Sequence, residues 1–127
     1  MQQGTVIARV YTSDAYLPLA QVPVVFTQIK PDGSRSLLAI RLTNSSGLTD
    51  PVSVETPNQS DSLIPGSTIQ PYATVSILAS KPGYTGILAE GVQIFPGVET
   101  IQGLQLRPVT LQNQGETETI REYPQNL

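Results

Sequence analysis

Residues 72–84 read YATVSILASKPGY, an alternating apolar segment that runs into a tight turn. The small and β-branched apolar residues fall on every second position, as in a strand with one buried face: Ala73, Val75, Ile77 and Ala79. In the turn, Pro82 fixes φ and Gly83 permits a positive φ, which is the chemistry of a reverse turn. The segment therefore predicts a β-strand and the connection to the next one.

The same pattern recurs on both sides of this segment. Further alternating runs are separated by turn sequences such as Lys30-Pro31-Asp32-Gly33-Ser34 and Asn44-Ser45-Ser46-Gly47. Short strands with turns at intervals of about 8–12 residues are typical of sandwiches and barrels. We predict an all-β Greek-key sandwich, immunoglobulin-like or transthyretin-like, of about seven strands: 4–12, 21–30, 35–43, 48–55, 72–80, 86–95 and 100–107.

The alternation also predicts the core, the turns and the domain boundary. Positive φ is expected at Gly47, Gly83 and Gly97, which end three of the turns. Residues 1–107 form the predicted sandwich, with 56–71 as a long crossover loop, and 108–127 form a polar C-terminal extension. The predicted inter-sheet core consists of the apolar members of the alternating runs: Val24, Phe26, Leu38, Ile40, Val75, Ile77, Leu104 and Leu106.

The composition excludes several classes of function. Charged residues make up only 13% of the chain, and seven Lys and Arg against ten Asp and Glu give a net charge of −3, so no basic face for nucleic acid is predicted. The chain has no Cys and no His, which excludes disulfides and the Ser-His and Cys-His catalytic pairs. No apolar run is long enough to span a bilayer, and Met1–Gly4 does not open a secretory signal.

The remaining candidates for chemistry have structural explanations. Ser45 and Ser46 precede Gly47 in a turn and have no His to activate a hydroxyl. Glu90 and Glu99 could face each other as a carboxylate pair, but surface carboxylates are common and the chain has no Trp platform for a sugar. Oxygen ligands such as Asp32 are too sparse for calcium. We predict a protein that is not an enzyme and has no catalytic, cofactor or metal site.

The order of the motifs resembles a known module. Gly4–Val10 is followed by Tyr16–Val24, then by Thr43–Thr49, and later by the turn Ser80-Lys81-Pro82-Gly83-Tyr84. This order resembles the carboxypeptidase-regulatory-like (transthyretin-like) β-sandwich modules over about residues 4–107. Glu90–Val98 is similar to the non-catalytic sandwich region of clostridial spore cortex-lytic proteases and related spore proteins. The resemblance implies a β-sandwich with no catalytic residue.

The C-terminal extension carries a candidate self-association segment. It holds few bulky apolar residues, so it cannot fold alone, but its alternating and Thr-rich parts suit a strand that adds to a sheet edge. Gln2 to Thr5 is the alternative donor strand. The candidate self-association residues are Val109, Leu111, Thr117, Thr119, Ile120 and Tyr123.

Together these features predict a non-enzymatic structural subunit. We expect it to form a homo-oligomer or homopolymer, a fibre or layer on a spore or cell surface, by donating a terminal strand to a neighbour. One alternative is an accessory module that docks a cell-wall hydrolase or peptidoglycan, with cell-wall or spore components as partners. Another is a phage or virion decoration domain. No nucleic acid, cofactor or membrane-spanning segment is expected.

Overall fold

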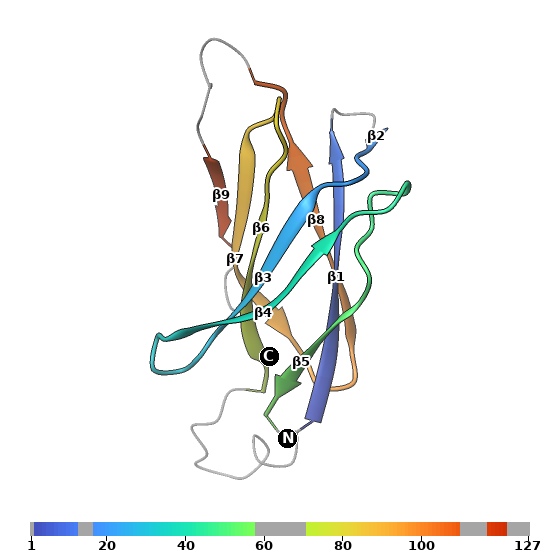
Figure 1. Ribbon diagram of the computed structural model, residues 1–127. Coiled ribbons are helices and arrows are strands. Elements are labelled where there is room, and N and C mark those ends of the chain that lie inside the picture. Colours follow the sequence, from blue (N-terminus) through green and yellow to red (C-terminus); the bar gives the residue numbers. More distant parts are fainter. Residues whose placement is uncertain (1, 13–16, 58–70, 110–116, 122–127) are drawn as a thin grey trace.

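The computed structural model describes residues 2–12, 17–57, 71–109 and 117–121, and within them all regular secondary structure is β-strand (Figure 1). The strands are β1 (Gln2–Thr12), β2 (Leu17–Pro18), β3 (Pro23–Ile29), β4 (Arg35–Leu42), β5 (Val52–Thr56), β6 (Ala73–Ala79), β7 (Gly86–Ile94), β8 (Glu99–Leu106) and β9 (Thr117–Arg121).

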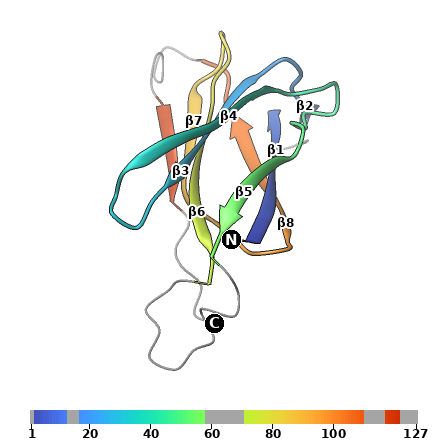
Figure 2. The same cartoon turned by 60° about the horizontal axis from the view of Figure 1, so that its bottom comes forward.

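The strands form two sheets that face each other (Figures 1 and 2). In sheet A, β1 pairs antiparallel with β5 and the short β2, and parallel with β8. Sheet B has the order β4-β3-β6-β7-β9. Its neighbours are antiparallel except for β7 and β9, which run parallel. The predicted β-sandwich is therefore confirmed.

All seven predicted strands are present, with ends that differ by up to four residues. The largest difference is at β5, which begins at Val52 where residue 48 was predicted. Leu48 makes only an isolated bridge with Arg9, and Pro51 lacks the N–H that a continuous ladder would need. The positive φ predicted at three glycines is confirmed, with values of 77°, 90° and 70° at Gly47, Gly83 and Gly97.

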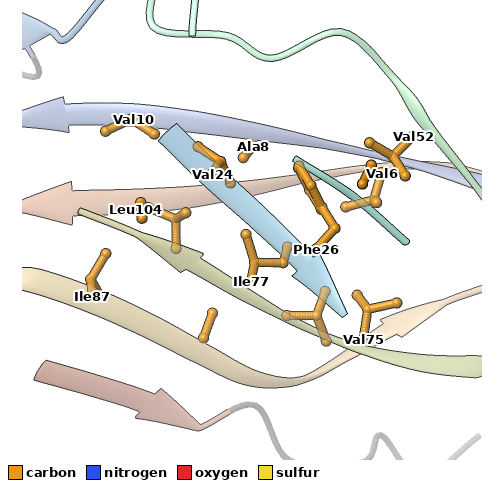
Figure 3. Packing of buried hydrophobic residues seen from close by; sticks show 14 of the residues in the cluster. Val6, Ala8, Val10, Val24, Phe26, Val52, Val75, Ile77, Ile87 and Leu104 are labelled. Carbon is orange, nitrogen blue, oxygen red and sulfur yellow. The ribbon is translucent and has the colours of Figure 1, made fainter. Parts of the chain in front are cut away.

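The core lies between the sheets, where side chains from both layers meet (Figure 3). Phe26 is the largest of the fully buried side chains, and Ile77 lies beside it on the neighbouring strand. Six of the eight predicted core residues are fully buried: Val24, Phe26, Val75, Ile77, Leu104 and Leu106. Of the other two, Leu38 is partly buried against the core.

The prediction for Ile40 is wrong, because its side chain is 56% exposed. Phe26 pairs with Ala39 and Thr27 pairs with Leu37, so Leu38 is an extra residue in β4, a β-bulge. The extra residue reverses which side chains face inward beyond it. Ala39, opposite Phe26, is therefore buried in place of Ile40.

Candidate functional site

The predicted tail strand exists and lies at the edge of sheet B. β9 runs parallel to β7, with Thr117 paired with Gly86 at one end and Arg121 paired with Glu90 at the other (Figure 1). In the single chain, the acceptor of this strand is the chain's own sheet. Pairing with a neighbouring molecule stays a prediction.

β9 pairs with β7 through its backbone, and its described side chains are largely exposed. The side chains of Thr117 and Thr119 are exposed, and Ile120 keeps 37% of its surface exposed. Gly86 makes room for the strand: a Cβ added there would lie 3.2 Å from the Thr117 Oγ1 atom. Main-chain pairing at a sheet edge depends on register more than on the identity of the side chains.

Backbone hydrogen bonds join the residues just after β8 to the residues just before β7. The Val109 backbone N–H donates to the Gly83 carbonyl oxygen at 3.0 Å, and the Thr85 N–H donates to the Arg107 carbonyl oxygen at 2.8 Å. Of the predicted self-association residues, Val109 is thus placed at this anchor, while Leu111 and Tyr123 lie outside the described residues. The anchor fixes where the tail leaves the sandwich.

A groove lies beside β9. It has a volume of about 400 Å³, and its lining includes Ile87, Thr119 and Ile120 on one side and Tyr11, Gly103 and Gln105 on the other. β9 therefore forms one wall of a space that reaches from sheet B to β8 of sheet A.

The alternative donor segment is built into sheet A. Gln2 to Thr5 pair with Thr56 to Ser53 of β5, and Thr5 also pairs with Glu99 of β8. A Cβ on Gly4 would collide with the Phe95 carbonyl oxygen, so the N-terminal strand lies close against the chain that follows β7.

Of the residues weighed for chemistry, Asp32 and Ser46 take part in turns, whereas Glu90 lies in β7 of sheet B and Glu99 in β8 of sheet A. The Ser34 N–H donates to Asp32 Oδ1 at 2.8 Å, and hydrogen bonds from the Ser34 side chain and backbone hold the pKa of this exposed carboxyl below its usual value. Asn44 Oδ1 likewise accepts from the Ser46 N–H at 2.8 Å. Within the described ranges, no three acidic side chains come together as metal ligands.

A second feature was not predicted from the sequence. In the part of the chain that the structure describes, β4 pairs with β3 alone, so its other edge is open. Three large apolar side chains of this edge strand are exposed: Leu37 at 62%, Ile40 at 56% and Leu42 at 56%. The sequence feature that could have indicated these exposed apolar side chains is the unbroken apolar run from Leu37 to Ile40. A strand with one solvent-exposed face would instead alternate apolar and polar residues.

Comparison with solved structures places the fold among β-sandwich proteins. The chain superimposes on the Bacillus anthracis TIE protein with a TM-score of 0.51 at 10% identity, covering 85% of this chain and 17% of that one. GBS52, the minor pilin of Streptococcus agalactiae, gives a TM-score of 0.48 at 15% identity over 86% of this chain and 46% of that one. The 3-chlorocatechol 1,2-dioxygenase of Rhodococcus opacus 1CP gives 0.49 at 16% identity over 84% and 60%.

The chain spans less than two thirds of each of these structures. No protein-family model matches the chain, and no curated protein matches it. In the described residues there is no helix of the length and apolar character needed to cross a membrane.

Proposed function

We propose that this protein is a non-enzymatic structural subunit that assembles into a fibre or layer on a spore or cell surface by donating its C-terminal strand to a neighbour. The observation that carries the proposal is the attachment of β9 to the edge of β7 through main-chain pairing with exposed side chains. A neighbour's tail can form the same hydrogen bonds on this edge, because every copy presents the same backbone.

Exchange of this strand would build an open assembly. Donor and acceptor surfaces differ, so each added subunit leaves a new donor and a new acceptor, and the assembly grows as a filament when the rotation between neighbours does not close a ring. Residues 110–116 join the anchor at Val109 to β9, and the eight steps from Val109 to Thr117 span at most about 29 Å. Neighbouring sandwiches must therefore lie in direct contact, with one anchor near the next β7 edge.

We further propose that the sandwich is related to the carboxypeptidase-regulatory-like modules and the spore proteins that its motifs resemble. The low charge and the turn-forming roles of the polar residues support a structural role. The surface location is part of this proposal.

Blocking the β7 edge tests strand donation. We expect Gly86→Val in the full-length chain to abolish assemblies seen by negative-stain microscopy and sedimentation, because the new side chain meets Thr117. Thr117→Gly in the same chain is the matched rescue, since it removes the atoms that the valine would strike. Deletion of 117–127 is expected to have the same effect as Gly86→Val.

Assemblies of unchanged shape in Gly86→Val and in the tail deletion would rule out the C-terminal strand as the donor. A full-length chain that stays monomeric at every concentration would overturn self-assembly itself. In that case the accessory-module function would be favoured. A groove of about 330 Å³, whose lining includes Gln28, Lys30, Glu55 and Tyr72, supports that alternative. Such a module gains mass only when peptidoglycan or a hydrolase is added.

The absence of catalysis is a separate prediction. The chain has no His or Cys, and the described Asp32 and Ser46 are engaged in turns. We expect no turnover of peptidoglycan or ester substrates above the rate of a heat-denatured sample. Turnover that disappears when a single residue, such as Glu90, is changed to Gln would contradict this prediction.

A further inference from the structure

We propose that the open edge of β4 binds β4 of a second copy of this chain, antiparallel, about a two-fold axis that passes between Leu38 and Ala39. This lateral contact is distinct from strand donation. β4 and β9 are the opposite ends of sheet B, with β3, β6 and β7 between them. At about 4.8 Å per strand spacing, the two edges are separated by about 19 Å.

The exposed side chains of β4 lie on one face of sheet B. Register with β3 places Leu37 opposite Thr27, Ile40 opposite Val25 and Leu42 opposite Pro23. The intervening β3 residues Val24 and Phe26 are fully buried, so these three pairs face away from the core. They lie on the outer face of sheet B, and their exposure is large because a neighbouring strand is present on one side only.

The outer face continues the apolar character inward from the edge. Ile40 pairs with Val25, Val25 with Leu78, and Leu78 with Leu88, which gives one apolar row across β4, β3, β6 and β7. No charged residue interrupts this row. In a second copy joined at β4 about this axis, the row meets Leu37, whose neighbours across β3 and β6 are Thr27 and Ser76, so no charges are brought together along it.

The sequence of β4 is self-complementary in one antiparallel register. With the axis between Leu38 and Ala39, Leu37 meets Ile40 of the second copy, so two outer-face residues lie opposite each other. Ser36 and Arg41 meet on the inner face, since β3 pairs them with Gln28 and Val24. The bulge at Leu38 lies at the axis, where it repeats symmetrically. A shift by one residue would instead oppose outer and inner side chains.

Charge also favours this register. Arg35 meets Leu42 and Arg41 meets Ser36, so no two arginines are directly opposite, an arrangement that would be unfavourable. The Arg41 guanidinium donates to the carbonyl oxygen of Ile40 at 3.1 Å in an exposed hydrogen bond. Water or a backbone N–H of the incoming strand can replace the Arg41 donor, so this hydrogen bond does not prevent a second strand from pairing with the edge.

Single cysteines test the register in the full-length chain, which contains no other Cys. Leu37→Cys and Ile40→Cys are prepared separately and oxidised alone or mixed. Directly opposite residues lie about 4.5–5.5 Å apart between Cα atoms, within disulfide range, whereas position 37 lies about 10 Å from its own copy along the strand. We expect the mixture to form disulfide dimers roughly tenfold faster than either variant alone.

Ile101→Cys is the matched control, since Ile101 is 59% exposed on β8 of sheet A. It is expected to form no dimer with either β4 variant. Equal rates in all samples would overturn the proposal. The absence of dimers in the mixture would overturn it as well, and is the result expected if the tail of a neighbour occupies this edge. Dimers in the mixture that persist with Gly86→Val would show the lateral contact even if strand donation fails.

Discussion

Phe26→Ala is expected to lower the free energy of unfolding by about 3–5 kcal/mol. Phe26 is fully buried on β3 of sheet B, between Ala39 on β4 and Ile77 on β6. Its ring points into the space between the sheets, where both layers supply apolar neighbours (Figure 3). Truncation leaves a cavity that rigid strands on both sides cannot close, so the loss of contacts adds to the loss of apolar burial.

Urea denaturation followed by circular dichroism measures this loss. Ile40→Ala is the matched control, because Ile40 lies on the adjacent strand but is 56% exposed, and its truncation is expected to cost less than about 1 kcal/mol. Equal losses for the two variants would contradict both the burial of Phe26 and the bulge that turns Ile40 outward.

The strands that could be predicted are those with strict alternation between well-marked turns. β6 matches its predicted range within one residue at each end, because Ala73, Val75, Ile77 and Ala79 alternate without interruption and Lys81-Pro82-Gly83 ends the run. The range of β4 was predicted equally well, but which of its side chains face the core was not. A bulge adds one residue without any change in composition, and Leu38 is as apolar as its neighbours, so nothing in the sequence marks it.

The C-terminal strand β9 shows a second reason why a feature of the fold could not be predicted from the sequence. Thr117 to Ile120 indicate a strand, but pairing through the backbone leaves little trace in the side chains. Gly86 becomes informative only when Thr117 is placed beside it. A tail strand could therefore be proposed from the sequence, while the position of Thr117, Thr119 and Ile120 beside β7 required the structure.

The turn that contains Gly47 is packed against β1, and Gly47→Ala is expected to destabilise the fold by about 2–5 kcal/mol. The φ of Gly47 is 77°, which disfavours any residue with a Cβ. The new Cβ would also collide with the Val10 carbonyl oxygen and approach the Pro18 Cβ at 3.2 Å. The neighbouring backbone cannot yield easily, because the Val10 N–H donates to the Gly47 carbonyl oxygen at 2.7 Å.

Gly83→Ala separates the cost of the positive φ from the cost of the steric collision, which act together in Gly47→Ala. Gly83 has a φ of 90°, but nothing lies within 4 Å of a Cβ built on it, so only the backbone term of about 1–2 kcal/mol is expected. Thermal and urea unfolding of both variants should therefore rank Gly47→Ala as the less stable. Losses of the same size would mean that the Asn44–Gly47 turn is not held against Val10 and Pro18. The close packing of this turn follows from the Asn44 side chain: its Oδ1 accepts from the Ser46 and Leu48 N–H groups at 2.8 and 3.1 Å, which fixes the loop before Gly47 meets β1.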